Sequence, residues 1–271
     1  MLAPNGSGSE TVLTAVLSIA GFDPSGGAGI IADIRTFIAL GCTPSAAITS
    51  LTFQNARGFS GAAHQTAETV RDQLVAIVAE LPIAAVKTGM LPTPEIVAEV
   101  ARLLRESSLP APVVDPVLRS TSGYELMQAD AIKILLTELM PMARVITPNI
   151  PEAEALTRLR IADEDGMREA AGKLSEMGAR AVLVKGGHLY GTAPGSERVK
   201  REAIDVLDNE GRVTVYRGEW IDSPPVRGTG CMLSAAIAAC LAKGEDLEEA
   251  IRLGKLFVAD EIRRTSESRV G

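Results

Sequence analysis

The stretch VLTAVLSIA, Val12–Ala20, is a continuous apolar run and predicts a buried strand. It leads into GFDPSGGAG, Gly21–Gly29, whose glycine, proline and aspartate residues are typical of a loop. The apolar segment from residue 30 to 40 then predicts a helix, which Gly41 ends. A strand, a loop and a helix in this order begin a β-α-β unit, so this stretch indicates an α/β fold.

The same alternation continues to the end of the chain. Further strands are predicted at 46–51, 84–88, 113–116, 144–147 and 181–185, and further helices at 66–81, 94–106, 128–139, 151–156, 163–177, 229–242 and 247–264. Residues 203–207 and 212–216 flank a turn-forming segment and predict a β-hairpin. We therefore expect a mostly parallel sheet, covered by helices on both faces, with a small antiparallel hairpin added. Without a repeat or a linker, the sequence predicts one domain over residues 12–271 behind a flexible N-terminal tail, residues 1–11.

Composition and charge limit the possible functions. The net charge of −7 argues against a surface for nucleic acid or for an anionic membrane. No apolar run is long enough to span a membrane, and no basic segment precedes the first apolar run as in a secretory signal. The three cysteines lack CxxC spacing and indicate reduced thiols, while the two distant histidines do not support a His-rich zinc site. We expect a cytoplasmic protein that binds small molecules.

Polar or flexible residues follow most of the predicted strands. In open parallel sheets, ligands bind beyond the carboxyl ends of the strands. The residues expected at that edge are Asp23, Gln54, Met90, Asp115, Asn149 and Gly186-Gly187.

The segment Gly228-Thr229-Gly230-Cys231 predicts an anion site. Glycines before a helix let successive N–H groups point at one place, and the helix N-terminus adds partial positive charge. The same position is expected to lower the pKa of the Cys231 thiol and to make it a catalytic group. The alternative interpretation is a glycine-lined helix start with a buried cysteine.

Three other segments each allow two interpretations. The loop Gly21–Gly29 matches neither a phosphate-binding P-loop nor a dinucleotide fingerprint, so Asp23 either contacts a ligand or only forms a turn. Asn149 and Glu152 supply oxygen atoms for Mg²⁺, with Asp115 nearby, or else form a helix cap. Residues 185–188 allow backbone to approach a nucleotide, or they form a plain turn.

Taken together, the motifs resemble the hydroxymethylpyrimidine and hydroxymethylpyrimidine-phosphate kinases of thiamin biosynthesis, members of the ribokinase superfamily. The resemblance is carried, in order, by residues 20–30 (AGFDPSGGAGI), 32–33 (AD), 54–55 (QN), 87–91 (KTGML), 115–117 (DPV), 147–152 (TPNIPE), 185–188 (KGGH) and 228–231 (GTGC). It implies a ribokinase-like three-layer αβα fold and transfer of phosphoryl groups from ATP with Mg²⁺. It also implies a homodimer as the expected partner state.

The resemblance assigns expected roles to individual residues. Gly228, Thr229 and Gly230 would cradle the transferring phosphoryl group, and Cys231 stands where most of the superfamily has an aspartate base. The substrate would contact Gln54, Asp33, Gly21, Asp23, Met90 and Val117. The nucleotide would contact Lys185, Gly187 and Arg227, and the metal would be ordered by Asp115, Asn149 and Glu152.

The chain departs from the family pattern at several places. Phe22 replaces a usual serine or threonine, and Arg227 replaces a usual histidine and is expected to contact phosphate. Residues 121–124 read TSGY where the family commonly has KSGD, and the family's C-terminal tail has no counterpart after Val270. Two alternatives stay open. One is a pyridoxal or pyridoxine kinase, since close relatives share the fold and the Gly-Thr-Gly-Cys motif, and the other is a non-catalytic pyrimidine-binding protein, which the departures at 121 and 227 suggest.

Overall fold

The computed structural model describes residues 14–55, 57–120, 122–187, 202–223 and 226–267. The predicted N-terminal tail, the first residues of the predicted strand at 12–20, and Thr121, His188, Pro225 and residues 269–271 lie outside this range. Within it, the strands form one nine-stranded sheet in the order β3-β2-β1-β4-β5-β6-β7-β8-β9. None of the helices in the described ranges is long and apolar enough to cross a membrane.

The sheet is parallel at its centre and antiparallel at both edges. Strands β2, β1, β4, β5, β6 and β7 pair in parallel, whereas β3 and the β8–β9 hairpin pair antiparallel. The bounds are β1 Ala15–Phe22, β2 Thr43–Asn55, β3 Gly58–His64, β4 Ile83–Thr88, β5 Val113–Val114, β6 Val145–Ile146, β7 Ala181–Lys185, β8 Glu202–Asn209 and β9 Arg212–Glu219. The predicted mostly parallel sheet with an antiparallel hairpin is confirmed.

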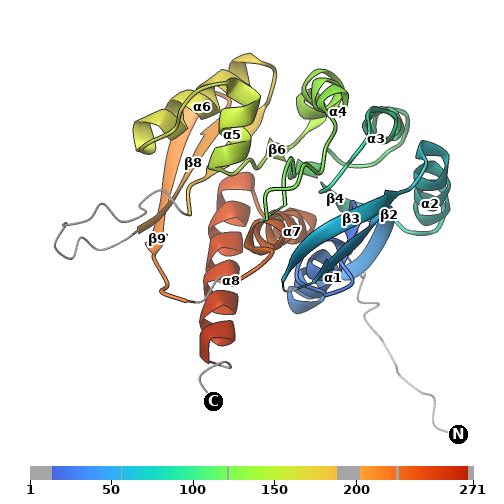
Figure 1. Ribbon diagram of the computed structural model, residues 1–271, viewed down its shortest axis with the longest axis horizontal. Helices are drawn as coiled ribbons and strands as arrows, with labels where there is room; N and C mark the ends of the chain where they lie inside the picture. Colours follow the sequence, from blue (N-terminus) through green and yellow to red (C-terminus); the bar gives the residue numbers. More distant parts are fainter. Residues whose placement is uncertain (1–13, 56, 121, 188–201, 224–225, 268–271) are drawn as a thin grey trace, which may run out of the picture.

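Helices cover both faces of this sheet (Figure 1). Because side chains alternate along a strand, Leu17 and Ile19 of β1 pack into one apolar core and Val16 into the other. The first core joins the sheet to α2 (Ala67–Glu80), α3 (Pro94–Glu106), α4 (Ala129–Ile134), α5 (Ile150–Thr157) and α6 (Glu164–Glu176). The second joins it to α1 (Gly29–Ala39), α7 (Thr229–Ala242) and α8 (Leu247–Glu267). The three-layer arrangement of helix, sheet and helix is therefore confirmed.

Local sequence signals account for several helix ends. Thr93 caps α3 by accepting a hydrogen bond from the Ile96 N–H, and Pro94 occupies the first helical position. Asp163 caps α6 in the same way through the Gly166 N–H. The predicted helix at 128–139 is not regular, because α4 passes into a π-helical turn, Leu135–Leu139, and a short 3-10 turn, Met140–Met142, that contains Pro141.

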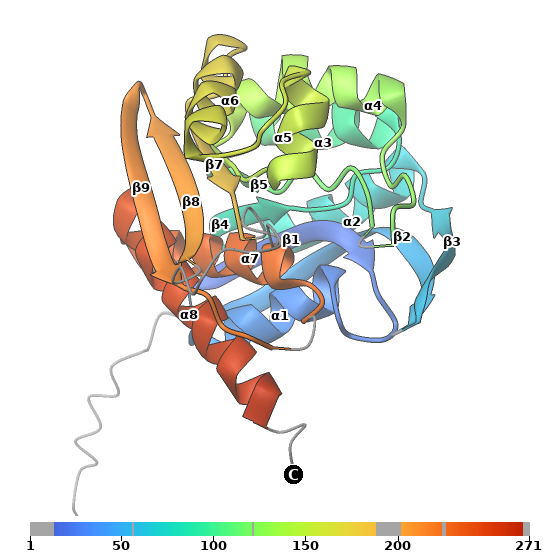
Figure 2. The same ribbon diagram turned by 60° about the vertical axis from the view of Figure 1, so that its left-hand side comes forward.

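Two strands differ from the prediction. Strand β2 runs on to Asn55, and an additional strand, β3, turns back along it to form the edge of the sheet. In this pairing Gln54, near the end of β2, lies opposite Phe59 of β3. Figure 2 shows β2 and β3 together at one end of the sheet and the β8–β9 hairpin at the other.

Candidate active site

A large open cavity lies along the carboxyl edge of the parallel strands. It is lined by the ends of β2, β4 and β7, by the loop before α1 and by the turn before α7. Strand β1 lies between β2 and β4, so the connections after β1 and β4 lead to opposite sides and leave a crevice there. The cavity therefore lies at the edge of the sheet where the sequence predicts that ligands bind.

Two helix N-termini meet at one side of the cavity through backbone contacts that require glycine. Gly228 has φ 76°, and a Cβ atom there would lie 2.1 Å from the carbonyl oxygen of Gly27. Gly29, the first residue of α1, has φ 57°, and its Cβ would lie 2.2 Å from the carbonyl oxygen of Gly21. No side chain fits at either position, so the chain closes tightly and its N–H groups are available for an anion.

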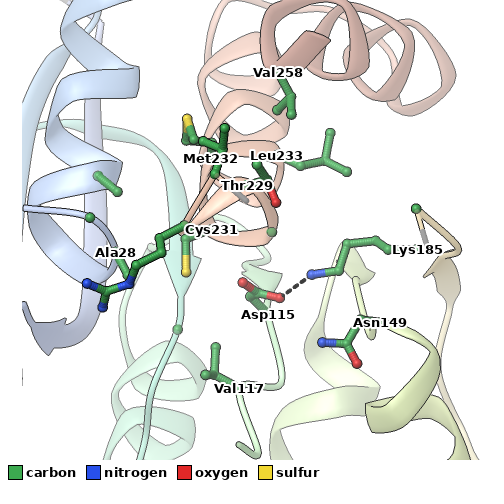
Figure 3. Close-up of a pocket in the computed structure, with 18 of the residues that line it drawn as sticks. Ala28, Asp115, Val117, Asn149, Lys185, Thr229, Cys231, Met232, Leu233 and Val258 are labelled. Carbon is green, nitrogen blue, oxygen red and sulfur yellow. Dashed lines mark hydrogen bonds and ion pairs between the residues drawn. The ribbon is translucent and has the colours of Figure 1, made fainter. Parts of the chain in front are cut away.

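Cys231 lies where these two helices converge, in the first turn of α7 (Figure 3). The Gly29 N–H, at the start of α1, favours the charged form of this thiol. Burial nevertheless raises the pKa of the Cys231 thiol to about 11, with Asp115 and Asp33 adding to the rise while Lys87 and the Gly29 N–H oppose it. The expectation of a lowered pKa is therefore wrong, because burial and two carboxylates outweigh the helix N-terminus.

Asp115 and Lys185 form an ion pair on the opposite wall. Lys185 Nζ lies 2.7 Å from Asp115 Oδ1, and Thr147 and Ser234 each donate a hydroxyl hydrogen bond to the same carboxylate. A Cβ on Gly230 would lie 3.2 Å from Lys185 Nζ, so the lysine reaches the glycine turn. Figure 3 shows this pair beside Asn149 and below Thr229. The pair therefore places a fixed positive charge next to the expected phosphoryl site.

Asn149 and Glu152 form a reciprocal helix cap at the start of α5. The Asn149 side chain accepts from the Glu152 N–H at 2.9 Å, and the Glu152 carboxylate accepts from the Asn149 N–H at 2.8 Å. Burial raises the pKa of Glu152 to about 7; Lys185 opposes the rise, and Asp115 adds to it. The structure thus shows the helix cap that was one of the two interpretations of Asn149 and Glu152. These two residues and Asp115, the expected metal ligands, all line the cavity.

A second ion pair is fully buried, with Lys87 in the cavity wall and Asp33 behind it. Lys87 donates to both carboxylate oxygens of Asp33, at 2.8 and 3.0 Å, and Ser18 donates to one of them at 2.6 Å. Asp33 is not among the residues that line the cavity. Its oxygens are engaged by Lys87 and Ser18 inside the protein, and its expected role beside Gln54 stays a prediction.

Gln54 and Arg227 lie in contact at the other end of the cavity. Arg227 Nη2 donates to Gln54 Oε1 at 2.7 Å, and Nη1 donates to the Asn55 carbonyl at 2.8 Å. The guanidinium also pairs with Asp23 at 3.4 Å. Arg227 therefore lies against the Gln54 end of the cavity, and its expected contact with phosphate stays a prediction.

Asp23 acts mainly as a turn former. Its carboxylate accepts from the backbone N–H and the hydroxyl of Ser25, at 2.9 and 2.7 Å, and its side chain is 1% exposed. It does not line the cavity, which favours the turn-forming alternative. Four further expected residues do line the cavity, namely Gly21, Met90, Val117 and Gly187.

Some supporting residues had no distinct sequence signal. Ser234 and Thr147 hold Asp115, and Thr52 accepts from the Gln54 amide at 2.9 Å. Ser234 and Thr147 are common residues inside a predicted helix and a predicted strand, and Thr52 directly follows a predicted strand, so only the three-dimensional contacts identify them. Across the described ranges, no cluster of three His, Cys, Asp or Glu side chains is arranged to hold a metal ion alone.

A family model described as phosphomethylpyrimidine kinase matches residues 23–271. The chain belongs to the phosphomethylpyrimidine kinase family. The hydroxymethylpyrimidine/phosphomethylpyrimidine kinase of Rhizobium meliloti is 43% identical over 262 residues, covering 96% of this chain and 94% of that protein. The enzyme of the same name from Streptomyces coelicolor is 40% identical and covers 91% and 88%.

A longer family member places the same unit within a larger protein. The thiamine biosynthesis bifunctional protein of Geobacter sulfurreducens is 42% identical over 92% of this chain, which spans 49% of its length. Family members are phosphotransferases, so this chain is a kinase.

Solved structures agree on the fold. Phosphomethylpyrimidine kinase from Clostridium difficile has a TM-score of 0.77 at 37% identity, with 92% of this chain and 99% of that chain covered. Pyridoxal kinase from Staphylococcus aureus, in complex with AMP-PCP, has a TM-score of 0.82 at 30% identity, with 92% and 88% covered. The ribokinase-like fold expected from the motifs is confirmed.

Proposed function

We propose that this protein phosphorylates 4-amino-5-hydroxymethyl-2-methylpyrimidine with ATP and then phosphorylates the resulting monophosphate to the diphosphate, as a step in thiamin diphosphate synthesis. The observation that carries the proposal is that one cavity is lined both by the anion turn, Gly228–Cys231, and by Gln54, Met90 and Val117. The first set suits a phosphoryl group and the second suits a flat ring with a polar edge. The names of the relatives agree with this pairing.

The chemistry depends chiefly on positioning and charge. Phosphoryl transfer needs its oxygens held and neutralised more than it needs a covalent intermediate. The glycine turn before α7 would offer its N–H groups to such oxygens, and Lys185 adds a positive charge beside Gly230. Cys231 is the candidate group to accept the proton of the hydroxymethyl oxygen, and its raised pKa limits how much of it is ionised near neutral pH.

Magnesium belongs to the same proposal. Asp115 and Glu152 already accept protein hydrogen bonds, so their oxygens suit a hydrated ion held through its waters better than direct ligation. Such an ion would offset the charge of the ATP phosphates. Asn149, at the N-cap of α5, offers a further side-chain amide in the same wall of the cavity.

A coupled ATPase assay with purified protein tests the function. We expect ATP consumption with hydroxymethylpyrimidine and with its monophosphate, and a dependence on Mg²⁺. Faster turnover of pyridoxal would support the alternative function of a pyridoxal kinase. The structural similarity of this chain to pyridoxal kinases suggests that alternative. Tight pyrimidine binding without ATP consumption would instead support a non-catalytic binding protein.

We further propose that the protein is a single-domain homodimer of the cytoplasm. All three of its cysteines are unpaired, as suits a reducing compartment. Leu51 and Phe53, both on β2 beside the edge strand, are 42% and 53% exposed and offer an apolar surface to a second copy. Light scattering on the purified protein measures the oligomeric state directly.

A further inference from the structure

Arg227 connects three segments that are far apart in the sequence. It lies two positions before α7, and its guanidinium reaches Ser25 in the loop after β1 and Gln54 at the end of β2. Its own backbone precedes Gly228, which touches Gly27 of the same loop. The side chain is 27% exposed, and its hydrogen bonds to Gln54 and Asp23 are partly buried.

The hydrogen bonds around Gln54 run in one direction only. Arginine can only donate, so the atom of Gln54 that faces Arg227 must be the amide oxygen. The Gln54 nitrogen donates to the Thr52 hydroxyl oxygen at 2.9 Å, and that hydroxyl donates onward to the Phe22 carbonyl at 2.8 Å. This series of hydrogen bonds cannot reverse its direction, because the Phe22 carbonyl can only accept and the Arg227 guanidinium can only donate.

From this geometry we infer that Arg227 is a specificity-determining positioning residue, which holds the Gln54 amide in one orientation and thereby sets the polarity of the substrate edge that the site accepts. The inference rests on the proposed function, because it assumes that the pyrimidine edge meets Gln54. One N–H of the Gln54 amide and one lone pair of its oxygen remain free for a ligand.

A fixed amide distinguishes two closely similar rings. A 4-aminopyrimidine presents an N–H donor beside a ring nitrogen acceptor, whereas its 4-oxo analogue presents an acceptor beside an N–H donor. A Gln54 amide that could rotate by 180° would match either ring. With its oxygen held by Arg227, it matches only one, and the other leaves buried polar groups unpaired.

The test is a double-mutant cycle read by calorimetric binding of the two rings without ATP. Arg227→Met, Gln54→Leu and the double variant are compared with the parent, using 4-amino-5-hydroxymethyl-2-methylpyrimidine and its 4-oxo analogue. We expect the Arg227→Met variant to bind the amino ring about tenfold more weakly than the parent, since a charge-assisted contact is lost. The variant should bind the oxo ring no more weakly than the parent does. In the Gln54→Leu background the same change should have little further effect.

Two additional variants separate positioning from general structure. Arg227→Lys keeps the charge and one donor, so it should restore part of the preference for the amino ring. Arg71→Met removes a surface arginine on α2 that pairs with Glu68, and it should alter neither ring's affinity. Thermal unfolding of each variant confirms that the compared proteins are folded.

The outcomes are distinct. Equal weakening of both rings by Arg227→Met, or the same weakening in the Gln54→Leu background, overturns the inference while leaving the proposed function intact. A parent protein that binds neither ring overturns the proposed function and the inference together. If Arg227→Met reduces the preference for the amino ring over the oxo ring, and does so only when Gln54 is present, the result supports both the proposed function and the inference.

Discussion

Lys87 Nζ lies 2.8 Å from Asp33 Oδ2, and neither side chain is exposed to solvent. The pair joins β4 to α1, and Lys87 is near enough to Cys231 for the two groups to interact electrostatically. Burial opposes the charge on Lys87, but Asp33, Cys231 and Asp115 outweigh it and raise the pKa of Lys87 above its usual range. The lysine therefore remains a cation inside the protein, close to the candidate base.

Replacing one member of this pair should be costly. Lys87→Met leaves the Asp33 carboxylate buried with Ser18 as its remaining donor, and we expect a loss of about 3–5 kcal/mol in the free energy of unfolding. Urea denaturation measures that loss. The double variant Lys87→Met/Asp33→Leu removes both charges and should recover much of it. A single variant as stable as the parent would mean that the pair does not carry a buried charge.

The pH dependence of turnover tests Cys231. Because burial raises the thiol pKa to about 11, the thiolate fraction increases as the pH rises from neutrality, and kcat should increase with it. Cys231→Ala should remove this increase and lower kcat by about 10², the low end of the usual effect of a general base. The KM for ATP should change little, since the backbone amides remain. A variant with the parent rate at every pH would make Cys231 a packing residue.

Gln54 should set affinity for the pyrimidine. Gln54→Leu leaves the polar edge of the ring unpaired and should cost about 1–3 kcal/mol of binding free energy. Calorimetry measures this loss, and the affinity for an ATP analogue serves as the internal control. Unchanged pyrimidine affinity would show that the amide does not face the ligand.

Glu152→Gln should change both magnesium use and the effect of pH on stability. The neutral amide holds a hydrated cation less well, so the variant should need more Mg²⁺ for half-maximal turnover. The folded-state pKa of about 7 lies above the usual 4.5, so the stability that the parent gains from this group is full below pH 4.5 and is lost as the pH rises to 7.

The glutamine variant does not titrate and should be more stable than the parent at pH 8, by roughly 1–3 kcal/mol. At pH 4 the two proteins should differ little. Glu169→Gln, at an exposed position of α6, is the matched control for both measurements. Unaltered Mg²⁺ titrations would leave Glu152 with the capping role alone.

The parts of the fold that depend on local patterns could be predicted. The apolar strands, the Thr93 and Asp163 caps and the β8–β9 hairpin all have signals within a few residues. Strand β3 does not: the segment GFSGAAH has one aromatic residue and no β-branched one, and it becomes a strand by pairing with β2.

The site was predictable in position but less so in chemistry. The strand ends indicated which residues gather at the cavity, and most of them line it. The contact between Arg227 and Gln54 spans 173 positions of sequence, so no local pattern reveals it. The thiol pKa was predicted from the helix N-terminus alone, while burial, Asp115 and Asp33 come from other parts of the fold.

The close contacts of Gly29 and Gly228 with neighbouring carbonyl groups have a consequence for how the enzyme could acquire new substrates. The proposed phosphoryl end of the cavity is built largely of main chain, beside the Lys185 and Cys231 side chains, and any side chain at either glycine would force the two helices apart. The proposed alcohol end is made of replaceable side chains, such as Gln54, Met90 and Arg227. In a mutant library selected for phosphorylation of a different alcohol, accepted changes should therefore concentrate at these three positions, and none should survive at residues 29 and 228.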